Sequence, residues 1–209
     1  MNRFWLKSYP SSVPADVDPA RLTSLAELLR QACTAYRDRP AYEQMGRLMT
    51  FGQLDQLTRD FAAWLQGAGL MKGDRIAIML PNTLQYPIAL FGALRVGLTV
   101  VNTNPLYTAR ELQHQLEDSG AKAILVLENF AHVVQEVAGR TRLEKVLVTA
   151  AGDFLGFPKS WIVNYVVRHR RKQVPKWHIP GAVSFRDALR AGHGRPLNPV
   201  DVGPEDIAF

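Results

Sequence analysis

Cysteine is almost absent from this sequence. The single residue, Cys33, has no partner within the chain, which excludes a disulfide scaffold. One cysteine, and a start that lacks the apolar core of an export signal, predict a cytoplasmic protein. Cys33 lies on the apolar side of a predicted helix, and this position favours a buried structural thiol over a reactive one.

Long apolar runs and metal-binding or nucleotide-binding patterns are also lacking. No run approaches the roughly 18 apolar residues that span a bilayer. Neither a Gly-x-Gly-x-x-Gly pattern nor a Walker-type lysine loop occurs, so a Rossmann or P-loop nucleotide site has no support. The histidines show no metal-ligand spacing with cysteine or carboxylates; they are His114, His132, His169, His178 and His193.

Acidic residues are scarce in one segment, residues 152–178. This segment has six lysine or arginine residues against the single acid Asp153, so it carries +5 of the net charge of +6. The basicity is therefore local, and it predicts one charged surface rather than a nucleic-acid-binding protein. The cations are Lys159, Arg168, Arg170, Arg171, Lys172 and Lys176.

Apolar and aromatic residues precede the densest part of this basic segment. Tryptophan beside lysine and arginine is typical of a peripheral membrane contact, here with the inner membrane. The residues assigned to such a contact are Trp161, Arg168, Arg170, Arg171, Lys172 and Trp177. A solvated basic loop packed by two tryptophans explains the same residues, and both readings stay open. Nucleic acid is a poorer third partner, because no binding motif accompanies the charge.

Four regions are predicted along the chain. Residues 1–23, rich in aromatic residues and proline, form an extended N-terminal segment, and residues 24–150 form an α/β subdomain. Residues 151–190 are a basic, aromatic-containing insertion with short helices. Residues 191–209, rich in glycine and proline, are a linker that leads into a further part of the protein.

Strands alternate with helices inside residues 24–150. Capping boxes at Ser24, Thr50 and Thr108 predict three helix starts. Short apolar runs predict strands, and helical periodicity predicts helices between them. The expected strands are 75–80, 98–101, 123–127 and 145–149, and further helices are 84–96 and 130–140. This order predicts an α/β fold with a mostly parallel sheet layered by helices on both faces.

Three motifs carry a family resemblance. Residues 48–54 (LMTFGQL) resemble the first core motif of adenylate-forming enzymes, a superfamily of acyl- and aryl-CoA synthetases, luciferases and peptide-synthetase adenylation domains. Residues 93–97 (ALRVG) and 102–107 (NTNPLY) resemble the second core motif. The sequence is most similar to bacterial long-chain fatty-acid–CoA ligases, and the resemblance covers nearly all of the chain.

The resemblance implies a two-step ligation in a longer parent enzyme. Fatty acid reacts with ATP·Mg to give acyl-adenylate and pyrophosphate, and coenzyme A then displaces AMP, for fatty-acid degradation or lipid metabolism. The family's phosphate loop is expected after Phe209, so this chain is expected to be an N-terminal piece of such a ligase. We therefore assign it no catalytic, cofactor-binding or metal-binding residue, and expect it to bind no cofactor and to be inactive alone.

Two further expectations concern partners. In similar enzymes the N-terminal domain contributes to dimers, which implies a homodimer formed through the N-terminal segment. A different class of protein also stays open, namely a non-catalytic α/β module that binds membranes or acyl chains through residues 161–177.

Overall fold

The centre of the fold is a five-stranded parallel sheet with the strand order β4-β3-β5-β6-β7. The structure, a computed structural model, describes residues 3–18 and 24–209. The strands are β3 (Arg75–Met79), β4 (Thr99–Asn102), β5 (Ala123–Leu127), β6 (Lys145–Thr149) and β7 (Val183–Ser184). The predicted α/β class with a parallel sheet is confirmed.

Side chains of each strand alternate between two hydrophobic cores, one on each face of the sheet. In β3, Ile76 and Ile78 join one core, whereas Ala77 and Met79 join the other. This alternation follows from the two-residue period of a strand. Both faces are covered, which explains why the strands read as continuous apolar runs in the sequence.

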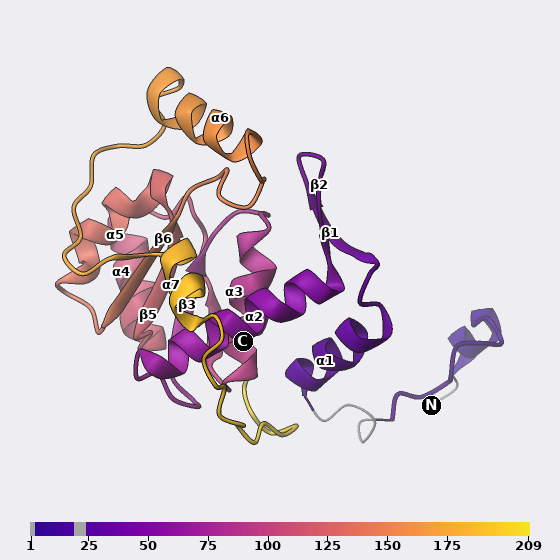
Figure 1. The fold of residues 1–209 in the computed structure, drawn as a ribbon. Coiled ribbons are helices and arrows are strands. Elements are labelled where there is room, and N and C mark those ends of the chain that lie inside the picture. Colours follow the sequence, from indigo (N-terminus) through magenta and orange to yellow (C-terminus); the bar gives the residue numbers. More distant parts are fainter. Residues whose placement is uncertain (1–2, 19–23) are drawn as a thin grey trace.

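Six helices in the described part of the chain cover the two faces of the sheet (Figure 1). One face carries α1 (Leu25–Ala35), α2 (Phe51–Gly67), α3 (Gln85–Arg95) and α7 (Phe185–Gly192). The opposite face carries α4 (Ala109–Ser119) and α5 (Ala131–Ala138). The predicted strands 123–127 and 145–149 coincide with β5 and β6, because each is a short apolar run buried on both faces.

Two of the three predicted capping boxes are complete. The side chains of Thr50 and Thr108 each accept a hydrogen bond from the backbone N–H of the third helical residue. The side chain of that residue in turn accepts a hydrogen bond from the backbone N–H of the threonine. At Ser24 the box is only half formed: Ser24 Oγ accepts from Glu27 N at 3.1 Å, but the Glu27 carboxylate binds Arg30 and Gln31 instead. These hydrogen bonds, first of all that of Arg30, lower the pKa of Glu27 to about 2.

A β-hairpin that the sequence did not predict precedes α2. It joins β1 (Pro40–Gln44) to β2 (Arg47–Thr50), and its two turn residues, Met45 and Gly46, have positive φ angles of 49° and 74°. Such turns match the twist of paired strands. The hairpin lies next to α1, where Cys33 is buried and burial raises the pKa of its thiol, as expected for a structural cysteine.

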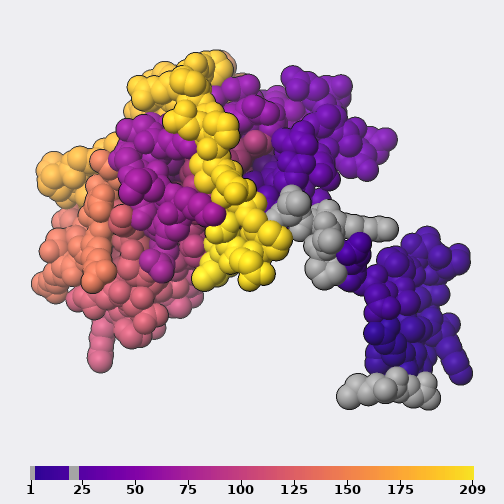
Figure 2. Space-filling view, turned by 90° about the horizontal axis from the view of Figure 1, so that it is seen from below, coloured from indigo at the N-terminus to yellow at the C-terminus, as the bar shows by residue number. Residues whose placement is uncertain are grey.

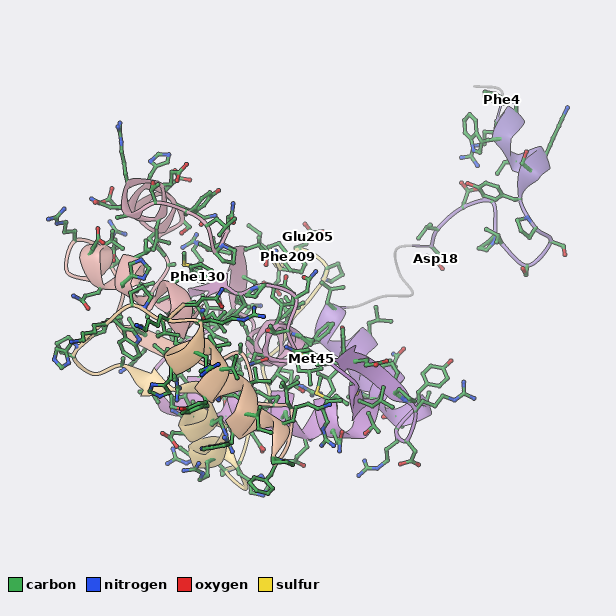
Figure 3. The ribbon with its side chains drawn as sticks, turned by 90° about the horizontal axis from the view of Figure 1, so that it is seen from above. Phe4, Asp18, Met45, Phe130, Glu205 and Phe209 are labelled. Atoms are coloured by element: carbon green, nitrogen blue, oxygen red, sulfur yellow. The ribbon has the colours of Figure 1, made fainter. Side chains whose placement is uncertain are left out.

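The described N-terminal residues lie away from the body of the fold. Residues 3–18 contain the short 3₁₀ helix η1 (Phe4–Ser8) and otherwise no helix or strand. In Figure 3, Phe4 and Asp18 lie far from Met45, Phe130 and Phe209, which belong to the body. Residues 1, 2 and 19–23 of the predicted N-terminal segment lie outside the described residues.

Residues beyond 150 return to the same sheet. After α6 (Lys159–Tyr165) and the π-helical turn η4 (Val166–Arg170), β7 pairs with β6 and α7 packs on α2. The C-terminal residues then run over the surface in irregular conformation (Figure 2). Asn198 and Gln66 exchange two hydrogen bonds of 3.0 Å, and Val100 N donates to Ala208 O at 2.9 Å. The predicted linker is therefore bound to α2 and to the free edge of β4.

Candidate functional site

The strand order places a candidate site at the carboxyl edge of the sheet. Within the five-stranded sheet, β3 comes first along the chain and lies between β4 and β5. The helices that follow β3 and β5 cover opposite faces of the sheet. The crevice between the carboxyl ends of two such strands is where open α/β sheets usually bind ligands. The residues that follow β3, β5 and β6 lie at this edge.

Buried polar groups gather at this edge. Gln85 is fully buried, and its side-chain amide donates to Ala150 O at 2.8 Å and to Thr149 Oγ1 at 3.3 Å. Among the described residues, the buried oxygens without a hydrogen-bond partner include those of Thr83, Gln85 and Asn129, which follow β3 and β5. Buried acceptors normally receive a hydrogen bond, so these oxygens mark the part of the edge where polar groups are left unpaired within the described chain.

A shallow depression lies at the ends of β3 and β4. It has a volume of about 280 Å³, and Asn82, Tyr86 and Asn104 contribute to its lining. Asn104 Oδ1 also accepts from Leu106 N at 3.0 Å, while Thr108 caps α4. The segment 104–107 thus turns the chain, as its sequence indicates, and also borders the carboxyl edge.

A larger groove of about 480 Å³ lies at the ends of β6 and β7. Its ionic lining residues comprise three arginines and three acids: Arg168, Arg186, Arg190, Glu128, Asp153 and Asp187. Asp187 pairs with Arg190 at 2.9 Å at the solvent-exposed rim. The groove therefore combines both signs of charge and has no excess of either.

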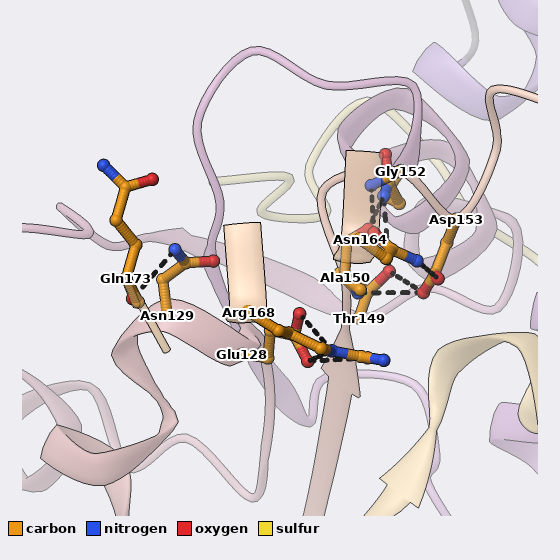
Figure 4. A network of polar contacts seen from close by, with 10 residues as sticks. Glu128, Asn129, Thr149, Ala150, Gly152, Asp153, Asn164, Arg168 and Gln173 are labelled. Atoms are coloured by element: carbon orange, nitrogen blue, oxygen red, sulfur yellow. Dashed lines mark hydrogen bonds and ion pairs between the residues drawn. The ribbon is translucent and has the colours of Figure 1, made fainter. Parts of the chain in front are cut away.

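Asp153 organises the inner end of this groove (Figure 4). Its Oδ2 accepts hydrogen bonds from Thr149 Oγ1 at 3.0 Å and from Ala150 N at 2.8 Å. Its Oδ1 accepts from Asn164 Nδ2 at 3.1 Å, and Asn164 in turn accepts from Gly152 N at 2.8 Å. These bonds fasten α6, through Asn164, to the carboxyl end of β6.

Arg168 provides a second attachment for the same helical segment. Its guanidinium makes three hydrogen bonds of 2.8–3.0 Å to Glu128, whose side chain is only 7% exposed. The hydrogen bonds to Glu128 raise the pKa of Arg168. Arg168, which the sequence assigned to a membrane contact, therefore points to the body of the protein.

The other sequence-predicted contact residues fall into two places. Trp161 is exposed on α6, and Arg170, Arg171 and Lys172 are exposed at the end of η4. Trp177 is instead half-buried and packs against the core shared with α4 and α5. The structure thus brings Trp161 close to the basic cluster in one helical segment and separates Trp177 from it.

Sequence reasoning missed Glu128, Asn129 and Gln85 as residues of the candidate site. The available signal was their position directly after a buried strand or at the start of the helix that follows one. The described residues contain no group of three or more histidine, cysteine or acidic residues suited to a metal ion. Nor does any helix in the described ranges have the length and apolar character needed to cross a membrane.

Many solved structures share this fold, among them the following two CoA ligases. An anthranilate CoA ligase in complex with anthranoyl-AMP superposes with a TM-score of 0.73 at 19% identity, covering 92% of this chain and 33% of the ligase. A long-chain-fatty-acid-CoA ligase from Archaeoglobus fulgidus superposes with a TM-score of 0.68 at 22% identity, covering 95% and 35%. At these identities the similarity shows the fold alone.

Sequence comparison gives a relative with much higher identity than these two structures. The chain is 51% identical over 210 residues to a long-chain-fatty-acid–CoA ligase of Salmonella typhimurium, an alignment that covers 100% of this chain and 37% of the relative. The chain thus spans little more than a third of that ligase. The sequence model of the AMP-binding enzyme family matches residues 29–209, so the resemblance seen in the motifs is confirmed. This protein belongs to the AMP-binding enzyme family.

Proposed function

We propose that this chain forms part of a long-chain fatty-acid–CoA ligase, which converts fatty acid, ATP and coenzyme A to acyl-CoA, AMP and pyrophosphate. The observation that carries the proposal is the 51% identity over the whole chain to such a ligase. The enzyme would act in fatty-acid degradation or lipid metabolism. Acyl-adenylate formation and thioester formation would both take place in the longer protein.

The residues of this chain do not by themselves fit ATP·Mg. Phosphate groups need backbone N–H donors and a lysine, and magnesium needs carboxylate oxygens. The sequence has no glycine-rich lysine loop, and no acidic cluster suited to a metal occurs among the described residues. We therefore assign no catalytic step to a residue of this chain. Its proposed contribution is the carboxyl edge of the parallel sheet, with Gln85 and Asn129.

Fatty-acid-dependent ATP–pyrophosphate exchange tests this function. We expect no exchange by the 209-residue chain, and exchange by a ligase in which the same residues are followed by the remaining length found in the relatives. The acyl length that gives the fastest exchange would identify the substrate. Exchange by the 209 residues alone would show that the phosphate site lies within them. Absence of exchange in both proteins would contradict the proposed ligase function.

The N-terminal segment is the proposed dimer contact. Phe4, Trp5 and Tyr9 are exposed, and residues 3–18 lie apart from the body. Exposed aromatic residues are typical of protein interfaces. Sedimentation equilibrium should give twice the monomer mass for the intact chain and the monomer mass after removal of residues 1–23. A dimer that survives this removal would place the interface elsewhere.

A second candidate function is a non-catalytic α/β module that binds membranes or acyl chains. The exposed aromatic side chains of α6, in one helical segment with the exposed cations Arg170, Arg171 and Lys172 at its end, favour this alternative. The same observation favours a ligase at the cytoplasmic face of the inner membrane that makes a peripheral contact. The exchange assay separates the two candidates, because only the ligase would turn over ATP.

A further inference from the structure

The segment 157–172 carries an exposed aromatic face that no other part of the described chain covers. Phe157 is 94% exposed, Trp161 is 66% exposed and Tyr165 is 47% exposed. In Figure 1, α6 projects from the body beyond the carboxyl edge of the sheet. Large aromatic side chains that cluster in solvent indicate an interaction surface.

The two sides of this helical segment have different roles. Asn164 and Arg168, four residues apart, face the body and bind Asp153 and Glu128. On the outer side, the rings of Trp161 and Tyr165 are stacked with centroids 5.6 Å apart, and Tyr165 lies 5.0 Å from the His169 ring. The inner contacts thus hold the helix in an orientation that presents the aromatic face outward.

Uncompensated cations adjoin the aromatic face. Arg168 is neutralised by Glu128, and Lys159 Nζ binds Met45 O at 2.9 Å. The four remaining cations of the basic segment are exposed, and none has an acidic partner within the described residues; they are Arg170, Arg171, Lys172 and Lys176. The surface therefore combines apolar rings with positive charge that no acidic group among the described residues pairs with.

We propose that Phe157, Trp161, Ile162 and Tyr165 insert into the headgroup region of an anionic bilayer while residues 170–172 bind its phosphates. Aromatic rings beside lysine and arginine suit the membrane interface, where rings meet the acyl boundary and cations meet anionic lipid. Nucleic acid would use the cations but gives exposed Ile162 no apolar partner. This inference rests on the peripheral contact proposed above, and it assigns Arg168 to positioning the helix rather than to lipid.

Co-sedimentation with vesicles tests the charge contribution. The chain should bind vesicles of phosphatidylethanolamine and phosphatidylglycerol, and should bind phosphatidylcholine vesicles much more weakly. The double substitution Arg170→Gln/Arg171→Gln should weaken binding about 25-fold, because each cation near an anionic leaflet contributes about fivefold in affinity. The control Arg140→Gln/Arg142→Gln removes the same charge from exposed residues after α5 and should change affinity less than twofold. Equal losses in both variants would refute a local contact.

The aromatic face has a matched control as well. Tyr165→Ala should weaken vesicle binding severalfold, whereas Tyr36→Ala, at 46% exposure against 47%, should leave it unchanged. Brominated lipids should quench the tryptophan fluorescence of the wild type, and Trp161→Phe should remove most of that quenching. Quenching that persists in Trp161→Phe would overturn the assignment.

Two outcomes separate this inference from the proposed function. Tighter binding to a DNA duplex than to vesicles, lost in Arg170→Gln/Arg171→Gln, would replace lipid by nucleic acid as the partner. The exchange assay with detergent-dispersed fatty acid and no vesicles tests the ligase alone. Exchange without vesicle binding would therefore refute the membrane surface and leave the proposed ligase function intact. Vesicle binding without exchange would refute the ligase function and leave the membrane surface intact.

Discussion

Gly192→Ala is expected to lower the free energy of unfolding by about 3 kcal/mol. Gly192 ends α7 where its backbone crosses α2, and a Cβ atom there would overlap the carbonyl oxygen of Asp60. A backbone atom inside a helix cannot move aside alone. α7 would have to separate from α2, which would also loosen the contacts of Phe185 and Leu189 with the core.

Gly139→Ala is the matched control for this substitution. Gly139 ends α5 with a φ angle of −74°, and no atom lies within 4 Å of a Cβ built there. Alanine should therefore be neutral, or stabilising by up to about 1 kcal/mol through the unfolded chain. Urea unfolding followed by circular dichroism measures both variants. Similar midpoints for the two would contradict the close approach of α7 to α2.

Phe61→Ala is expected to cost about 4 kcal/mol, at the upper end of aromatic deletions. Phe61 lies on α2 with no exposed surface, and its ring meets Phe185 edge to face at 4.9 Å and stacks on Trp64 at 6.1 Å. The ring also fills the space above Gly92 of α3. Removing it would leave a cavity where α2, α3 and α7 meet, and these helices cannot close it because the sheet fixes their spacing.

Phe157→Ala makes the same chemical change at an exposed position. It should alter the free energy of unfolding by less than about 0.5 kcal/mol, because the ring is 94% exposed. Urea unfolding should show an unchanged slope and midpoint for Phe157→Ala and a much lower midpoint for Phe61→Ala. A loss below about 1 kcal/mol in Phe61→Ala would mean that α2, α3 and α7 close the cavity, and would contradict a helix spacing fixed by the sheet.

The sheet could be predicted from the sequence because its signals are local. β5 is an apolar run of five residues, β6 contains a run of three apolar residues, and Thr108 with Glu111 marks the start of α4 within four positions. Burial on both faces makes such runs uniform in composition. β7 escaped prediction because Val183 and Ser184 form no pattern by themselves, and only pairing with β6 makes them a strand.

The surroundings of the candidate site could not be predicted, because its contacts join residues far apart in the chain. Glu128 and Arg168 are 40 residues apart, and nothing beside Arg168 indicates a buried carboxylate partner. Trp161 and Trp177 look equivalent in sequence, but one is exposed and the other packs against the core. Composition can locate a basic surface, but only the fold decides which cations remain free.

The packing of α7 on α2 also bears on the order in which the protein is made. Asp60 and His193, which meet at 3.1 Å across these helices, are 133 residues apart. At roughly 5–20 residues per second, about 7–27 s separate their synthesis on the ribosome. During that interval, the surface of α2 on which α7 packs in the folded protein is not covered by α7. On the nascent chain, the apolar surface around Phe61 therefore lacks its α7 partner until that helix has been made.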